Sequence, residues 1–178
     1  MAHDFLIRPT EERDLPAIAE IYGESVRTGT ASFELEPPDV AEMTRRWREL
    51  AAKTYPHIVA TRGGALLGYA YAGPYRSRPA YRFTVEDSVY VARPAQDQGV
   101  GRALLSALID AAEARGFRLM IAVIGDKESA GSIRLHRSLG FAPVGVLEPV
   151  GYKHGRWLAS VLMQRVLGEG ASTPPAQL

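Results

Sequence analysis

The stretch VYVARPAQDQGVGRALL, residues 89–105, passes from one kind of secondary structure to another within a few residues. VYV is typical of a β-strand, Gly99 and Gly101 allow a sharp turn, and RALL begins a helical pattern. Glycines let a ligand approach the backbone, and the first turn of a helix offers unpaired N–H groups and a partial positive charge. The stretch therefore predicts an anion site suited to a pyrophosphate, although an isolated Gly-x-Gly is more often only a tight turn.

The strand that leads into this turn carries two adjacent carboxylates. Residues 84–91 read TVEDSVYV, with Glu86 and Asp87 side by side. Successive strand residues face opposite sides, so one of the two points into whatever the sheet packs against, where a charge is costly unless it is paired or used. The structural alternatives are an ion pair of Glu86 with Arg82 or Arg78, and a nearby arginine or helix N-terminus as the partner of Asp87.

The rest of the chain divides into further strand and helix patterns. Apolar residues with a period of two, or in short continuous runs, predict strands, and a period near 3.6 predicts helices. The expected strands are about 5–9, 57–62, 65–75, 81–91, 117–125, 142–147 and 157–166, and the expected helices are about 15–27, 39–50, 102–115 and 129–139. A strand meander followed by strand–helix–strand favours an α/β (α+β) domain with a mixed sheet.

Length and composition set limits on the kind of protein. The chain has 178 residues, 46% hydrophobic and 23% charged, with a net charge of +1 and no cysteine. These values predict one globular domain, residues 1–167, with no partnership with nucleic acid or membrane and no thiolate chemistry. The small, Pro-rich stretch 168–178 is expected to be a disordered tail. No secretory signal and no run of about eighteen apolar residues is visible, so a cytoplasmic location is expected. Histidines 3, 57 and 154 lack metal-ligand spacing, so no metal is expected.

Gln96, Gly99 and Gly101 fit the pattern Gln/Arg-x-x-Gly-x-Gly/Ala that follows a V-x-V strand, so the segment resembles the acetyl-CoA-binding segment of GNAT acetyltransferases. The stretches GPYRSRPAYRFTVEDSVYV, AVIG, SIRLHRSLGF and GYKHGRW resemble pieces of the phosphinothricin and methionine sulfoximine N-acetyltransferase branch. The resemblance covers residues 5–166. It implies the GNAT fold: a mixed, mostly antiparallel seven-stranded sheet with a central splay, flanked by about four helices.

The same resemblance implies acetyl-CoA as co-substrate. Its pantetheine arm would lie beside the strand at residues 89–91, and N–H groups of residues 97–102 would hold its pyrophosphate. The implied cofactor-binding residues are Val89, Tyr90, Val91, Gln96, Asp97, Gln98, Gly99, Val100, Gly101, Arg102 and Ser129. Ser129 departs from the branch, which usually has Asn there, and a hydroxyl carries one donor rather than two.

Two catalytic residues follow from the resemblance. Glu86 matches the carboxylate that binds the substrate ammonium and accepts its proton, directly or through water. His136, in SIRLHRSLGF, stands where many GNAT enzymes have a tyrosine that protonates the departing CoA thiolate. Because imidazole titrates near neutrality, His136 is expected to act as that acid or as a second base.

The resemblance also implies a substrate side. Guanidinium groups hold carboxylates through paired hydrogen bonds, which suits Arg76 or Arg78 for an α-carboxylate. The implied substrate-binding residues are Phe33, Tyr75, Arg76, Arg78, Glu86 and Asp87. Tyr152 and Lys153 recur in the family, but no role for them follows. A homodimer with sites near the interface is implied as well.

The leading hypothesis is an N-acetyltransferase that moves the acetyl group of acetyl-CoA to the α-amine of a small amino acid or analogue by direct attack in a ternary complex. No cysteine carries an acetyl group, and no Ser-His-Asp arrangement is evident. One alternative keeps the chemistry but acetylates a protein N-terminus, a polyamine or an aminoglycoside. The other alternative is a non-catalytic acyl-CoA-binding sensor.

Overall fold

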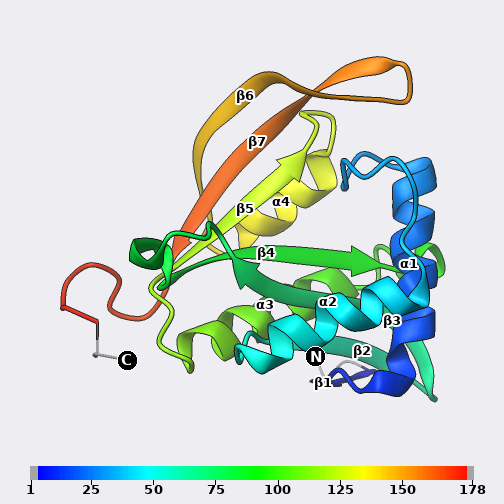
Figure 1. Ribbon diagram of the computed structural model, residues 1–178, viewed down its shortest axis with the longest axis horizontal. Coiled ribbons are helices and arrows are strands. Elements are labelled where there is room, and N and C mark those ends of the chain that lie inside the picture. Colours follow the sequence, from blue (N-terminus) through cyan, green and yellow to red (C-terminus); the bar gives the residue numbers. More distant parts are fainter. Residues whose placement is uncertain (1–3, 176–178) are drawn as a thin grey trace.

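Seven strands form one mixed sheet in the order β1-β2-β3-β4-β5-β7-β6, as seen in a computed structural model that describes residues 4–175 (Figure 1). The strands are β1 Leu6–Pro9, β2 His57–Arg62, β3 Ala65–Pro74, β4 Thr84–Val91, β5 Leu119–Gly125, β6 Ala142–Lys153 and β7 Arg156–Val166. The helices are α1 Leu15–Thr28, α2 Val40–Ala52, α3 Val100–Glu113 and α4 Ala130–Ser138. The seven-stranded mixed sheet and the four helices confirm the architecture expected from the sequence.

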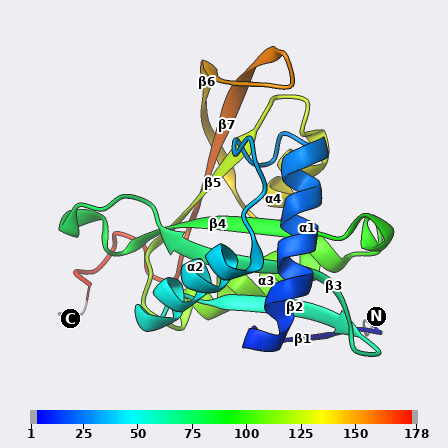
Figure 2. The same ribbon diagram turned by 45° about the vertical axis from the view of Figure 1, so that its right-hand side comes forward.

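The two faces of the sheet are covered by different helices. Helices α1 and α2 lie on one face, and α3 and α4 lie on the other (Figure 2). Alternate residues of β2 face the two helix layers. Ile58 and Ala60 pack in the cluster that contains α3, whereas Val59 packs with α1. Leu104, Leu105 and Leu108 of α3 are fully buried, and each such side chain contributes about 1.5–3 kcal/mol.

The pair β4–β5 is the one parallel neighbour pair of the sheet, and it is short. Its pairing joins Thr84–Asp87 to Leu119–Ala122. Beyond that point β4 pairs with β3, and β5 pairs with β7. The two strands therefore separate toward their carboxyl ends, which is the central splay that the family resemblance implies.

The end of β6 differs from the boundary expected from the sequence. Strand β6, expected to end near residue 147, continues to Lys153 and turns into β7 at His154 and Gly155, which both have positive φ angles of 52° and 74°. The β6–β7 hairpin projects beyond the rest of the sheet (Figure 1). Residues 168–173 form turns, and the Arg118 guanidinium donates to the carbonyls of Gly170 and Pro174 and to the hydroxyl of Thr173. Residues 176–178 of the expected tail lie outside the described residues.

Candidate active site

A cavity of about 340 Å³ occupies the space where β4 and β5 separate. Its walls come from both strands, from the loop between α1 and α2, and from α4. Of the residues expected from the sequence, these line it: Phe33, Glu86, Asp87, Val89, Tyr90, Ser129 and His136. The closed end lies where strand pairing stops, at Asp87 and Ala122.

Glu86 stands at the junction of two cavities. A second cavity of about 350 Å³ lies between the sheet and α2, and it shares Glu86, Ser88, Tyr71 and Tyr22 with the first. Burial, and then the neighbouring charge of Asp87, raise the pKa of Glu86 above its ordinary value. Within the described residues no ion pair or hydrogen bond joins its carboxylate to Arg78 or Arg82, the alternative that its sequence left open. Glu86 is therefore a carboxylate with raised basicity and no competing partner in this part of the chain.

Asp87 faces the opposite side of β4 and meets α4. Its Oδ2 lies 3.0 Å from Nε2 of His136, whose Nδ1 lies 2.8 Å from the carbonyl oxygen of Ser132. Both side chains are almost completely buried. Burial alone lowers the pKa of His136, but the hydrogen bond and charge of Asp87, with the Ser132 carbonyl, outweigh it and raise that pKa. The structure thus brings together two predicted residues that are 49 positions apart in the chain.

The turn before α3 has the backbone geometry of an anion site. Gly99, directly before the helix, has a φ of 82°, and Asp97 has a φ of 58°. No side chain caps this helix end among the described residues, so its first N–H groups face outward. The side chains of Gln96 and Gln98 donate back to the carbonyls of Val91 and Pro94, which shapes the turn. Arg102 donates instead to the hydroxyl of Ser138 at the end of α4.

The hydroxyl group of Ser129 already uses its one hydrogen-bond donor within the chain. Its hydroxyl donates to the carbonyl of Gly125 at 2.7 Å. A cofactor amide that meets Ser129 therefore finds a hydroxyl oxygen that only accepts, whereas an asparagine would also donate.

The loop between α1 and α2 is held over the cavity by the turn end of the β6–β7 hairpin. The Phe33 ring lies so close to Gly125 and Gly151 that a Cβ at these positions would lie 3.0 and 2.5 Å from it. The buried Lys153 ammonium donates to the carbonyl of Ser32 at 2.7 Å, and burial lowers the pKa of that lysine. In the sequence, Lys153 is indicated only by the stretch GYKHGRW, which resembles the family, and no role for it follows from that resemblance.

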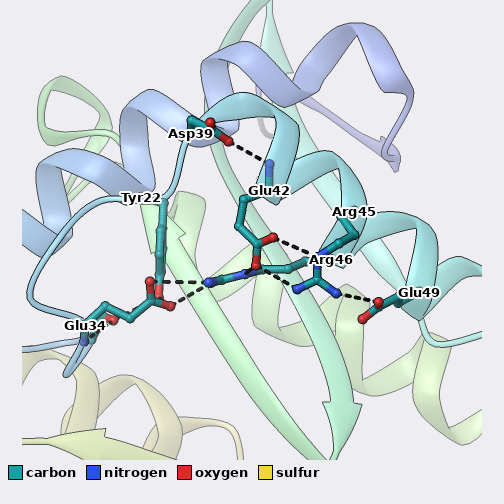
Figure 3. Close-up of polar contacts among 8 residues, drawn as sticks. Tyr22, Glu34, Asp39, Glu42, Arg45, Arg46 and Glu49 are labelled. Atoms are coloured by element: carbon teal, nitrogen blue, oxygen red, sulfur yellow. Dashed lines mark hydrogen bonds and ion pairs between the residues drawn. The ribbon is translucent and has the colours of Figure 1, made fainter.

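A polar network ties the same loop to α1 and α2 (Figure 3). The Tyr22 hydroxyl donates to Glu34 at 2.9 Å and lies 2.8 Å from the hydroxyl of Ser32. Glu34 also accepts from Arg46 at 2.6 Å, and Arg46 in turn donates to Glu42 at 2.7 Å. Burial above all raises the pKa of Tyr22 to about 12, so its hydroxyl stays neutral. Sequence reasoning did not single out Tyr22 or Tyr71, because apolar periodicity marks both as core residues.

The arginines expected on the substrate side lie elsewhere in this chain. The Arg76 guanidinium stands over the rings of Tyr75 and Tyr81, at 5.1 and 6.0 Å from their centroids. Tyr75, Arg76 and Arg78 line neither of the two cavities. Their roles toward a substrate stay predictions.

Between residues 4 and 175 no group of three or more His, Asp or Glu side chains is arranged to hold a metal ion. None of the helices described there is long and apolar enough to cross a membrane. The cytoplasmic location stays a prediction.

Comparison with known proteins agrees with this geometry. The model of the Acetyltransferase (GNAT) family matches residues 16–141. A phosphinothricin N-acetyltransferase of Alcaligenes faecalis is 52% identical over 169 residues, which cover 95% of this chain and 86% of that protein. An L-methionine sulfoximine/L-methionine sulfone acetyltransferase of Pseudomonas paraeruginosa is 41% identical, over 94% of this chain and 98% of its own. A crystal structure of a GNAT superfamily phosphinothricin acetyltransferase from Sinorhizobium meliloti with AcCoA has a TM-score of 0.95 and 47% identity, and covers 98% of this chain and 94% of the other.

Proposed function

The chain belongs to the GNAT family of acetyltransferases, and on that premise we propose that it transfers the acetyl group of acetyl-CoA to the α-amine of a small amino acid or amino-acid analogue. The acceptor is of the phosphinothricin or methionine sulfoximine type. This choice rests on the relatives named for these compounds, two of which match over nearly the whole chain.

One observation carries the chemical part of the proposal. Glu86 stands at the edge of the strand split, half-buried, with a raised pKa and no ion partner among the described residues. An amine reaches the enzyme mostly as an ammonium ion and must lose a proton before its nitrogen attacks. A carboxylate in this position binds the ammonium and takes that proton.

The first cavity and the α3 turn fit acetyl-CoA. Backbone groups of Val89 and Val91, unpaired with β5, would bond the pantetheine amides as an added strand does. The backbone N–H groups from Asp97 to Arg102 would hold the pyrophosphate at the helix end. A backbone N–H near Val89 would polarise the thioester carbonyl as negative charge develops on it. Acetyl-CoA supplies the activated acetyl group, and the chain supplies orientation and proton transfer.

The acceptor would lie under the α1–α2 loop. Phe33 covers the cavity from this loop, and the second cavity extends beyond Glu86 toward apolar side chains of α2 such as Trp47 and Leu50. An amino acid with its amine at Glu86 would place its side chain in this region. We keep the homodimer as part of the proposal. Several apolar side chains of the projecting hairpin are exposed, and a second copy would cover them: Val144, Val146, Leu147, Val150, Tyr152 and Trp157.

A thiol-release assay with acetyl-CoA tests the function. The panel contains L-phosphinothricin, L-methionine sulfoximine, common L-amino acids, a polyamine, an aminoglycoside and a short peptide. We expect turnover confined to the amino acids and analogues, and a loss of about 10²–10⁴-fold in kcat for Glu86→Gln. Glu20→Gln, which removes an exposed carboxylate of α1 that lines neither cavity, is the matched control and should leave kcat unchanged. Turnover of the peptide alone, or full activity of Glu86→Gln, would contradict the proposal.

A further inference from the structure

His136 has no ring nitrogen left to offer the cavity. A carbonyl oxygen only accepts, so Nδ1 must carry a hydrogen toward Ser132. The carboxylate of Asp87 likewise accepts from Nε2. Both ring nitrogens are therefore engaged, Nδ1 by Ser132 and Nε2 by Asp87, and giving up a proton to a molecule in the cavity would break one of these bonds.

Asp87 has the free atom of the pair. Its Oδ2 is bonded to His136, whereas its Oδ1 is buried and has no hydrogen-bond partner within residues 4–175. Asp87 lines the cavity at the closed end of the strand split. A buried carboxylate oxygen without a partner is costly, so its presence beside a cavity points to a hydrogen that a bound molecule supplies.

We propose that Asp87, rather than His136, gives the leaving sulfur its proton, with Oδ1 as the shuttling atom and His136 as the positioning residue that holds Asp87 through Oδ2. This inference rests on the proposed acetyl transfer. It assigns the two carboxylates of β4 to the two faces of the strand, Glu86 to the acceptor and Asp87 to the thioester.

The protons balance in this scheme. The ammonium and acetyl-CoA give the N-acetyl product, the CoA thiol and one proton. Glu86 takes the first ammonium proton and releases it to water. Once the carbon–nitrogen bond has formed, Oδ1 of Asp87 takes the second proton from nitrogen and passes it to sulfur as the carbon–sulfur bond breaks. Asp87 ends each turnover as it began, and the third hydrogen stays on the amide.

Few other titratable groups face this pair. Strand β4 contributes Glu86, a second carboxylate, whose pKa is raised by burial and by the charge of Asp87. Helix α4 contributes His136 itself. The tyrosines Tyr22, Tyr71 and Tyr90 line the same cavity, but burial raises their pKa values, so they stay neutral near physiological pH. The stretch 122–125 of β5 has no titratable side chain. His136 is thus the one titratable side chain directly bonded to Asp87 in the described part of the chain.

The test compares Asp87→Asn and Asp87→Ser with His136→Gln. Asparagine keeps the shape without the charge, serine removes the carboxylate with little bulk, and glutamine keeps a donor near Oδ2 without a proton that titrates near neutrality. At about pH 8 we expect both Asp87 variants to lose about 10²-fold or more in kcat, with KM for acetyl-CoA within about threefold. His136→Gln should lose less than about tenfold in kcat, and its pH profile should change, because the side chain bonded to Asp87 no longer titrates.

A second readout needs no turnover. In ¹H–¹⁵N spectra of the free protein, both ring nitrogens of His136 should be protonated at about pH 7.5, and in Asp87→Asn one should lose its proton. A neutral His136 ring in the unsubstituted protein would overturn the assignment. So would a loss of kcat in His136→Gln as large as in the Asp87 variants, without any movement of the pH profile.

These outcomes are separable from failure of the proposed function. The unsubstituted protein is first run on the full amine panel, and the variants are then compared on whichever amine it acetylates. Turnover only on a peptide would contradict the proposed acceptor, and the Asp87 variants would then be compared on that peptide. Equal rates for Asp87→Ser and the unsubstituted protein would contradict the role of Asp87 in proton transfer, but not the proposed amine substrate.

Discussion

The buried His57 should make the stability of the fold depend on pH in a measurable way. Its Nδ1 lies 2.7 Å from the Thr10 hydroxyl, and its ring stacks on Tyr69 and Tyr71 at 5.7 and 5.3 Å. Burial lowers the pKa of His57 from 6.5 to about 4, against a small opposing effect of Asp14. The unfolded chain therefore binds a proton below pH 6.5 that the folded chain refuses until about pH 4, so stability is full above the unfolded pKa and is lost as pH falls.

The magnitude follows from the two pKa values. At about 1.4 kcal/mol for each pH unit, His57 should remove about 2.5 kcal/mol from the free energy of unfolding between pH 7.5 and 4.5. Carboxylates titrate in the same range, so the informative quantity is the difference between the protein and a variant. His57→Gln and His57→Phe each remove the titration, the first keeping polarity and the second keeping the ring stack. Urea unfolding at both pH values should show each difference change by about 2.5 kcal/mol. Differences that are the same at both pH values would refute the reasoning.

His136, whose pKa is raised, should affect stability with the opposite sign. Its contribution to the free energy of unfolding is full below its unfolded pKa and is lost as pH rises through its folded pKa.

Two further predictions concern the loop over the cavity. Lys153→Met removes the ammonium that holds the Ser32 carbonyl, so KM for the amine should rise about tenfold while KM for acetyl-CoA stays the same; equal rises in both would argue against a role specific to the acceptor. Gly151→Ala places a Cβ 2.5 Å from the Phe33 ring, which should displace the ring, cost about 1–3 kcal/mol of stability and raise KM for the amine. Gly145→Ala, on the same strand with no atom within 4 Å of the added Cβ, is the control, and a matching effect there would refute the steric argument.

Most of the fold could be predicted from local patterns, and the exceptions have physical causes. Strand β6 was expected to stop near residue 147, and the residues that follow include Pro149 and Gly151, which are typical of turns. The strand continues because β6 lies at the edge of the sheet, where a missing N–H is tolerated, and its pairing with β7 shifts register between Leu147 and Gly151. Neither the edge position nor the bulge is visible in the sequence of this segment.

In the candidate site, the local sequence pattern predicts which way a side chain faces, but not which distant residue it contacts. The period of two in β4 correctly separates Glu86 from Asp87, but it does not say what each side chain meets. The partner of Asp87 depends on where α4 docks, and a docking position is set by the packing of the whole sheet. The family resemblance implies a role for Arg76 toward the substrate, and that role stays a prediction. The Arg76 guanidinium lies over the tyrosine rings of its own loop, a contact that is not visible in the sequence motif.

The register of β4 is therefore as much a part of this site as its side chains. Within the sheet Glu86 lies between Gly73 of β3 and Ile121 of β5. Because side chains alternate, a slip of one residue would exchange the faces of Glu86 and Asp87, leaving a carboxylate toward α4 without its place beside His136. Gly73 has no side chain on the face where Glu86 meets the second cavity, and a Cβ there would lie 3.5 Å from Leu50 of α2. A small neighbour on β3 and an abrupt end of pairing with β5 thus leave the space in which Glu86 and Asp87 can serve two different reactants from one strand.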